Sequence, residues 1–163
     1  MLKLYWGIYL IYQGVTQVPH VTSGCYLVDE SKLIELIKEH EGVRAFPYVD
    51  SMGKLTIGAG RNLTDRGISI STIESMLAED IALAKSELDK KFPEWCGLSD
   101  NRQMVLISMA FNLGMPRYNK FKRFWAALEA GDYDLAADEM IDSRWRKQVK
   151  GRAVELAGMM RRG

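Results

Sequence analysis

The sequence contains few cysteines and histidines, and this scarcity excludes several classes of chemistry. Among 163 residues there are two cysteines and two histidines. Cys25 and Cys96 are too few for a disulfide framework, and neither lies in a CxxC pair. With only His20 and His40 to add, the sequence offers no zinc-binding constellation and no support for a Ser-His-Asp grouping. We therefore expect chemistry that needs no metal and no cofactor.

A strong excess of one charge and a long apolar run are also missing. The formal net charge is +1, so no global field argues for a nucleic-acid partner. The apolar and aromatic segment 4–12 is far shorter than the about 20 residues that a membrane span requires. Apolar residues make up 47% and charged residues 26%, which is ordinary for one soluble globular domain with a real core.

Charge is uneven locally, because residues 141–163 carry seven basic against two acidic side chains. The basic residues are Arg144, Arg146, Lys147, Lys150, Arg152, Arg161 and Arg162. One interpretation is a helical face in water. The other is attraction to an anionic wall or to outer-membrane lipid. The sequence leaves both open.

The most informative feature is a carboxylate at the end of an apolar helix. Three aliphatic residues recur there at helical spacing: Leu33, Ile34 and Ile37. Asp29 or Ser31 can cap the helix, Gly42 can end it, and Glu41 falls on the apolar stripe in the last turn. Burial and the negative end of the helix dipole both disfavour a charged Glu41. The pattern predicts a carboxylic acid that keeps its proton, as a general acid must.

A β-hairpin with a second carboxylate follows. Residues 46–50 and 55–57 are β-prone, and residues 51–54 have the composition of a turn. Asp50 and Thr56 flank this loop and are expected to face each other, where a carboxylate and a hydroxyl could hold one water. Two carboxylates in unlike environments are what glycoside hydrolysis requires. Each residue alone is unremarkable in sequence, and the ordered combination carries the prediction.

This combination resembles a known signature. The pattern Glu41-x8-Asp50-x5-Thr56, followed by Ile-Gly-Ala-Gly, is similar to the catalytic motif of the phage-type lysozymes, glycoside hydrolase family 24. The segment SMAFNLG at 108–114 resembles the core-helix motif of that family. The pattern Ser143-Arg-Trp-x6-Arg152-Ala resembles its C-terminal motif. The resemblance covers about residues 30 to 163, with three motifs in the right order.

The resemblance implies a muramidase endolysin of a tailed phage. Its reaction is hydrolysis of the β-1,4 bond between N-acetylmuramic acid and N-acetylglucosamine in peptidoglycan. By position, Glu41 is the acid, Asp50 the second carboxylate and Thr56 the hydroxyl that places the water. The implied fold is α+β and mainly helical, lysozyme-like, with a small β-hairpin lobe and a larger helical lobe around a cleft. A lytic transglycosylase that uses Glu41 alone, and a non-catalytic wall-binding module, are the alternatives.

Three further residues are predicted to bind substrate, two of them where the chain departs from its relatives. Arg61 stands where the family often has histidine, and it could contact a peptidoglycan carboxylate or simply be surface charge. Asn112 stands where some relatives carry glutamine, and its amide could still bond an N-acetyl group. Arg152 would lie near Glu41 by resemblance, where its charge would lower the pKa of the acid.

The rest of the chain is predicted to be helical. A capping box at Ser71 begins one helix, which breaks by Pro93, and Ser99 begins another that ends at Gly114. Further helices are expected at 121–130, 132–143 and 151–160. Trp125 and Trp145 have helical neighbours and are expected in the core.

Residues 1–28 lie outside the resemblance, and residues 29–163 are predicted to form the catalytic domain. A structural arm, a signal or membrane tether, and a wall-contact element are the alternatives for the N-terminal segment. The resemblance implies an enzyme made in the host cytoplasm that reaches the periplasm or cell wall with the help of a partner holin. We expect a monomer that binds the peptidoglycan glycan strand and no nucleic acid.

Overall fold

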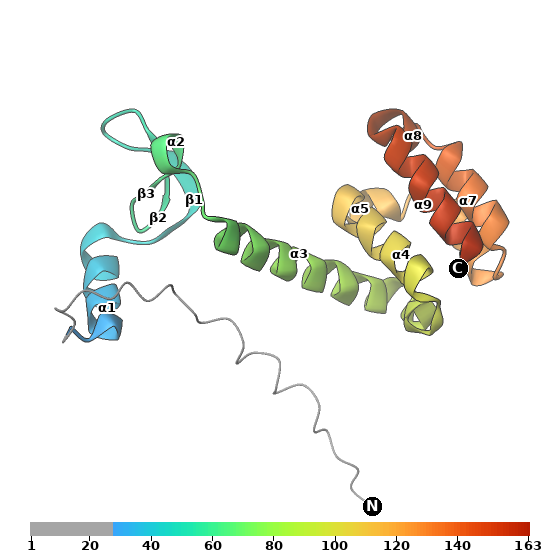
Figure 1. The fold of residues 1–163 in the computed structure, drawn as a ribbon, viewed down its shortest axis with the longest axis horizontal. Helices are drawn as coiled ribbons and strands as arrows, with labels where there is room; N and C mark the ends of the chain where they lie inside the picture. The colour runs from blue at the N-terminus through green and yellow to red at the C-terminus, as the bar shows by residue number, and fades with distance from the viewer. Residues whose placement is uncertain (1–27) are drawn as a thin grey trace, which may run out of the picture. The chain divides into compact units, whose positions relative to one another are not determined.

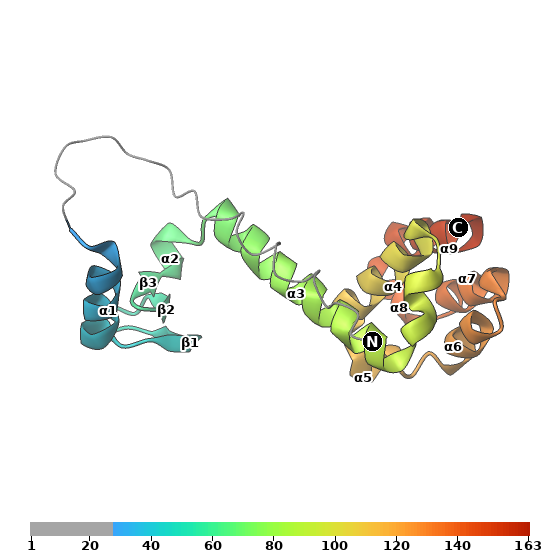
Figure 2. The same cartoon turned by 90° about the horizontal axis from the view of Figure 1, so that it is seen from below.

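The computed structural model describes residues 28–163, which divide into two compact units at Gly67 and Ile68. Figures 1 and 2 show the elements of both units in two views. The first unit contains the sheet, and the second is made of helices. The α+β, mainly helical fold class of a lysozyme is confirmed. The roles considered for the N-terminal segment concern residues that, Val28 apart, lie outside the described part.

Helix α1 (Glu30–Glu41) opens the first unit and begins and ends as its sequence predicts. The Asp29 side chain accepts a hydrogen bond from the backbone N–H of Lys32 at 3.2 Å, which makes Asp29 the N-cap. Gly42 ends the helix with φ of +69°, a backbone conformation that glycine adopts at little cost.

The sheet has the order β1-β2-β3 and is antiparallel throughout, with β1 at Arg44–Val49, β2 at Leu55–Gly58 and β3 at Arg61–Asn62. Thr56 lies in the central strand, opposite Tyr48 on one side and Asn62 on the other. The predicted hairpin is therefore confirmed. Strand β3 and the four-residue helix α2 (Leu63–Arg66) were not predicted, because elements this short carry no periodic pattern.

The second unit contains a series of helices joined by short connections. They are α3 (Ile70–Lys91), the 3₁₀-helix η1 (Pro93–Gly97), α4 (Asp100–Leu113), α5 (Met115–Tyr118), α6 (Lys122–Glu129), α7 (Tyr133–Ile141), α8 (Arg144–Val149) and α9 (Gly151–Arg162). Helix α4 packs against α3 and α9, while α7 packs against α6 and α9. Helix α4 buries Val105, Leu106 and Met109 in the core of this unit.

An aromatic cluster forms part of the core of the second unit. Tyr118, Phe124 and Trp125 are buried, with ring centroids 4.6 Å apart for Tyr118 and Trp125 and 5.4 Å apart for Phe124 and Trp125. The indole N–H of Trp125 donates to the Tyr118 carbonyl at 3.0 Å. Trp145 is also buried, so the prediction that Trp125 and Trp145 are core residues is confirmed.

Helix α3 differs from its prediction in two respects. Its N-cap is Ser69, whose hydroxyl accepts from the Thr72 N–H at 3.2 Å, so the predicted capping box at Ser71 is wrong. Because Ser69 is extended and already reaches that amide, Ser71 lies inside the helix. Of the apolar residues of this helix, only Ala84 and Leu88 are buried. No helix within residues 28–163 is long and apolar enough to cross a membrane.

The hydroxyl of Tyr118 is buried and lacks a hydrogen-bond partner within the described residues, and burial raises the pKa of this phenol well above its usual value. A buried polar group without a partner costs free energy, so Tyr118→Phe should raise the free energy of unfolding by about 1 kcal/mol. Urea unfolding of the full chain measures this. Tyr133→Phe, at a half-buried tyrosine, is the control and should change stability by less than about 0.5 kcal/mol. A loss of stability in Tyr118→Phe would show that the Tyr118 hydroxyl does have a hydrogen-bond partner.

Candidate active site

Asp50 is held by the backbone of the turn that it begins. Its Oδ1 accepts hydrogen bonds from the backbone N–H groups of Met52 and Lys54, both at 2.9 Å. The N–H of Asp50 itself donates to the Lys54 carbonyl at 2.9 Å. Gly53, with φ of +74°, allows the chain to reverse within this four-residue loop. The turn therefore fixes one carboxylate oxygen and leaves Oδ2 for other partners.

These contacts favour the ionised form of Asp50. The hydrogen bond from the Lys54 N–H is the largest cause that lowers its pKa below the usual value, and partial desolvation acts in the opposite direction. The Met52 N–H, the Thr56 hydroxyl and the Lys54 ammonium group lower the pKa further. Asp50 is thus a carboxylate at neutral pH, able to accept a proton but not to supply one.

Thr56 brings a hydroxyl to the second oxygen of Asp50. Its Oγ1 lies 3.2 Å from Asp50 Oδ2 and 3.2 Å from the Lys54 carbonyl, and both groups accept from it. Thr56 is only 3% exposed, because it sits in the central strand. One hydroxyl proton is shared by the two acceptors, so the oxygen of Thr56 keeps lone pairs that can accept from a third group. The expected proximity of Asp50 and Thr56 is present in the structure.

The Glu41 carboxylate lies beside the turn between β2 and β3. Glu41 is the last residue of α1, and its Oε2 lies 3.9 Å from the position that a Cβ on Gly60 would occupy. Gly60 has φ of +81° and lies in the turn between β2 and β3. The Gly-x-Gly segment thus allows the tight turn and brings the backbone at Gly60 beside the Glu41 carboxylate.

The prediction that Glu41 lies on a buried face is wrong within the described part of the first unit. Glu41 is exposed, and α1 contributes no buried residue. The aliphatic residues before it are also exposed, at 42% for Leu33, 51% for Ile34 and 43% for Ile37. Helical periodicity places these side chains on one stripe, but burial depends on another element packing against that stripe, and residues 28–67 supply none.

The other predicted site residues fall in different parts of the fold. Arg61 is half-buried in β3, where its Nε donates to the Gly67 carbonyl at 2.8 Å. This bond anchors the side chain at the end of α2 and leaves the guanidinium Nη groups without an ion pair in the described part of the chain. Its contact with a peptidoglycan carboxylate stays a prediction.

Asn112 and Arg152 belong to the second unit. The indole N–H of Trp145 donates to Asn112 Oδ1 at 2.7 Å. An indole can only donate, so this bond fixes the orientation of the amide and leaves Nδ2 free to donate. Arg152 is exposed in the first turn of α9 and forms no ion pair with the described residues. The substrate roles of both residues stay predictions.

A set of residues that tie the Asp50 turn to α2 was missed in the sequence. Lys54 Nζ pairs with Asp65 Oδ1 at 3.0 Å, and the Leu55 N–H donates to Thr64 Oγ1 at 2.9 Å. Asn62 caps α2 by accepting from the Asp65 N–H at 2.9 Å, and its amide donates to Asp65 Oδ2 at 3.0 Å. The Asn62-x-x-Asp65 spacing is a helix-start signal that could have revealed this cap. Residues 28–163 contain no group of three or more His, Cys, Asp or Glu side chains able to hold a metal ion.

The family model described as phage lysozyme matches residues 38–163, which include Glu41, Asp50 and Thr56. The chain belongs to the phage lysozyme family. Membership in this family supports a lysozyme-type glycosidase activity on the bacterial cell wall.

Three curated relatives show how far the similarity extends. The chain is 31% identical to an endolysin of Acyrthosiphon pisum secondary endosymbiont phage 1, over 83% of this chain and 91% of that protein. It is 25% identical to a probable T4-type lysozyme of Dictyostelium discoideum, over 82% of this chain and 95% of that protein. It is 30% identical to the pre-baseplate central spike protein of Enterobacteria phage T4 over 74% of this chain, but spans only 26% of the spike protein.

The lowered pKa of Asp50 predicts an acid-dependent contribution to stability. A carboxyl group whose folded pKa lies below its unfolded value stabilises the fold above about pH 4, and this contribution is lost as pH falls through the folded pKa. Asp50→Asn should therefore lower stability at pH 7, and its difference from wild type should shrink below about pH 4. Urea unfolding followed by the amide signals of the hairpin measures this difference. If the stability difference between Asp50→Asn and wild type did not change with pH, the ionised Asp50 carboxylate would not be its cause.

The tie between Lys54 and Asp65 predicts that Asp65 positions the catalytic turn. An exposed ion pair is worth about 0.2–1 kcal/mol, so Asp65→Asn should lower kcat for wall hydrolysis by a factor of about 1.4 to 5 and leave KM unchanged. Asp80→Asn, at an exposed residue of α3 without an ion pair among the described residues, is the matched control. Equal losses in both variants would show that Asp65 has no specific role.

Proposed function

We propose that this protein is an endolysin-type muramidase that hydrolyses the β-1,4 bond between N-acetylmuramic acid and N-acetylglucosamine in peptidoglycan. The observation that carries the proposal is the 3.2 Å contact between Thr56 Oγ1 and Asp50 Oδ2, with the other Asp50 oxygen held by two backbone N–H groups. An ionised carboxylate beside a buried hydroxyl forms a site for one water molecule.

In the proposed reaction this water attacks the anomeric carbon of the muramic acid. Asp50 Oδ2 accepts one proton of the water, while Thr56 Oγ1 accepts a hydrogen bond from its second proton. The glycosidic C–O bond breaks, and Glu41 gives its proton to the leaving oxygen. After the reaction Glu41 has lost one proton and Asp50 has gained one. The configuration at the anomeric carbon is inverted.

The position of Glu41 supports its role as the acid. Its exposed carboxyl group lies at the end of α1 beside Gly60, where a glycosidic oxygen could approach from solvent. Asp50 is a poor candidate for this role, because every hydrogen bond to its carboxylate favours the ionised form.

Three residues are proposed to bind substrate. Asn112 Nδ2, oriented by Trp145, would donate to an N-acetyl carbonyl oxygen. The Nη groups of Arg61 would contact a carboxylate of the peptide stem, and the exposed Arg152 would contact an anionic group of the substrate.

The biological setting follows from the same proposal. The enzyme, made in the host cytoplasm, would act as a monomer on the wall or in the periplasm and cause host cell lysis, with a partner holin providing export. Residues 29–163 would form the catalytic domain and residues 1–28 an N-terminal extension. The basic side chains of residues 141–163 would add attraction to the anionic envelope.

Glu41→Gln and Asp50→Asn should each lower kcat on purified peptidoglycan by about 10² to 10⁴, because each removes a proton-transfer group. Glu39→Gln, two residues earlier on the exposed surface of α1, is the matched control and should retain activity. Mass spectrometry of the products should show reducing muramic acid ends, and NMR should show the inverted anomer as the first product.

Other products would distinguish the two alternatives. Anhydro-muramic ends that survive Asp50→Asn would overturn the two-carboxylate mechanism and leave Glu41 acting alone as in a lytic transglycosylase. Wall binding by wild type without any cleavage would point to a non-catalytic binding module. The Asp50–Thr56 pair argues against the transglycosylase, whose chemistry needs no bound water.

A further inference from the structure

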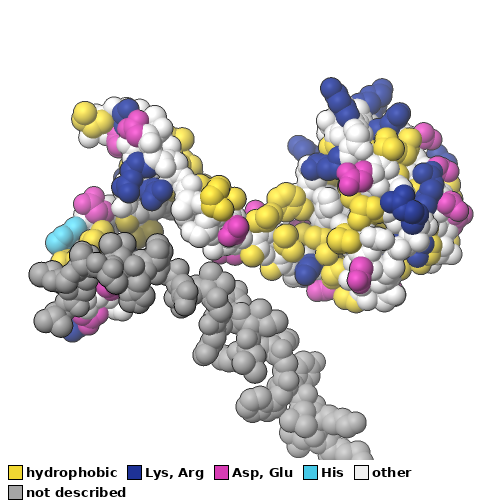
Figure 3. All heavy atoms as spheres, in the orientation of Figure 1, with side chains coloured by type: hydrophobic (Ala, Val, Ile, Leu, Met, Phe, Trp, Pro, Cys, Tyr) yellow, Lys and Arg dark blue, Asp and Glu magenta, His cyan; other side chains and the backbone are white. Residues whose placement is uncertain are grey.

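Thr56 is the only buried residue within the described part of the first unit, residues 28–67. Hydrophobic side chains are visible on the surface of this unit in Figure 3, and Met52, in the loop of the hairpin, is 80% exposed. A hydroxyl residue is thus shielded more completely than any aliphatic residue around it. The side chains next to Thr56 in the sheet therefore decide how freely its hydroxyl can turn.

Two residues flank Thr56 across the sheet, Tyr48 in β1 and Asn62 in β3. Residues directly opposite each other in antiparallel strands point to the same face, with Cβ atoms about 4.5–5.5 Å apart. The side chain of Asn62 is committed to α2, because its amide oxygen and its amide nitrogen both bond to Asp65. Tyr48 is half-buried, and its ring shields Thr56 from the side of β1.

The ring of Tyr48 is itself held by Arg44. The guanidinium carbon of Arg44 lies 4.4 Å from the centre of the ring, which is a cation–π contact. Arg44 forms no ion pair with any residue of 28–163, so no carboxylate there draws its charge away from the ring. Strand β1 is irregular between Arg44 and Tyr48, and irregularities of this kind re-aim side chains beside active sites.

The rotamer of Thr56 decides whether its hydroxyl meets Asp50. A threonine side chain has three staggered rotamers, and the one present places Oγ1 at 3.2 Å from Asp50 Oδ2. In the other two rotamers a methyl group or a hydrogen takes the place of the hydroxyl. A ring packed opposite this branched side chain disfavours those rotations, because they would move the methyl group into space that the ring occupies.

We propose that Tyr48, fixed by Arg44, is a positioning residue that keeps the Thr56 hydroxyl directed at Asp50. The role rests on the proposed function, in which this hydroxyl and the Asp50 carboxylate hold the attacking water. Tyr48 and Arg44 act through Thr56, and neither needs to touch the substrate.

Kinetics on purified peptidoglycan test this role. Tyr48→Val removes the ring and keeps a residue suited to a strand, so kcat should fall about tenfold while KM changes less than about twofold. Tyr48→Leu is a second variant with the same expected result. Tyr48→Phe keeps the ring and should keep kcat within about twofold of wild type. Phe46→Val, which removes a ring that is 82% exposed from the same strand, is the matched control and should behave as wild type.

A double-mutant cycle tests the part played by Arg44. Arg44→Gln alone should lower kcat about two- to fivefold, as expected for the loss of one cation–π contact. In the Tyr48→Val background the same change should have no further effect, because Arg44 acts through the ring. Equal effects of Arg44→Gln in both backgrounds would show that Arg44 does not act through Tyr48.

NMR tests the positioning without any substrate. Three-bond couplings from the Thr56 methyl carbon to the backbone report the rotamer of this side chain. They should indicate one rotamer in wild type and Tyr48→Phe, and averaging over several in Tyr48→Val. This measurement needs no cleavage. A wild type that failed to cleave peptidoglycan would contradict the proposed function, while the couplings would still test the positioning of Thr56.

Four results would overturn the positioning role. These are an unchanged kcat in Tyr48→Val and Tyr48→Leu, a loss in Tyr48→Phe or Phe46→Val as large as in Tyr48→Val, a raised KM with unchanged kcat, and a Thr56 rotamer that does not respond to removal of the ring. A raised KM alone would make Tyr48 a substrate contact instead. Circular dichroism confirms that each variant is folded.

Discussion

The candidate site depends on one interaction, the capture of the Asp50 carboxylate by the backbone of its own turn. Two N–H groups at 2.9 Å satisfy Oδ1 and favour its ionised form, which fixes both the charge and the direction of Oδ2. The Thr56 hydroxyl can then meet Oδ2, because the same turn brings the central strand back beside it. A backbone-held carboxylate needs no buried cation, so it can remain open to a substrate and to water.

The remainder of the first unit restrains this turn from outside. Asn62 begins α2, Asp65 in its first turn binds Lys54, and Thr64 accepts from the Leu55 N–H, so a four-residue helix is joined to the catalytic loop by two side chains. Because none of these contacts is buried, each contributes little free energy on its own. Their effect is to reduce the number of conformations that the loop can adopt, which matters more for a reacting geometry than for global stability.

Local features of this fold could be predicted from sequence, and features that depend on distant partners could not. The Asp50–Thr56 contact spans six residues, so turn chemistry and spacing were enough to find it. The burial of Glu41 was predicted wrongly from the stripe of Leu33 and Ile37, since periodicity indicates which side chains share a face but not what covers that face. The start of α3 was misplaced because Ser69 and Ser71 are both plausible caps, and the backbone at Ser69 decides between them.

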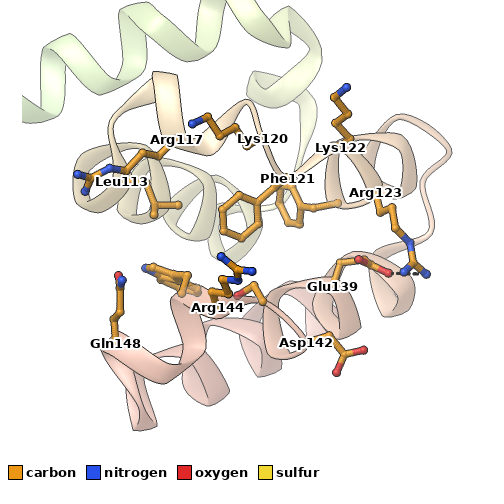
Figure 4. A pocket seen from close by; sticks show the side chains of 13 residues that line it. Leu113, Arg117, Lys120, Phe121, Lys122, Arg123, Glu139, Asp142, Arg144 and Gln148 are labelled. Atoms are coloured by element: carbon orange, nitrogen blue, oxygen red, sulfur yellow. Dashed lines mark ion pairs between the residues drawn. The ribbon is translucent and has the colours of Figure 1, made fainter.

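The distribution of charge in the second unit shows the same limit. Counting residues along 141–163 detected the excess around Arg144, but the fold also brings the exposed Arg117, Lys120 and Lys122 to the rim of the hollow beside α8 (Figure 4). A net charge of +1 averages this concentration away, because acidic residues elsewhere cancel it in the sum but are too distant to cancel it in space. Like charges gathered by a fold reduce its stability.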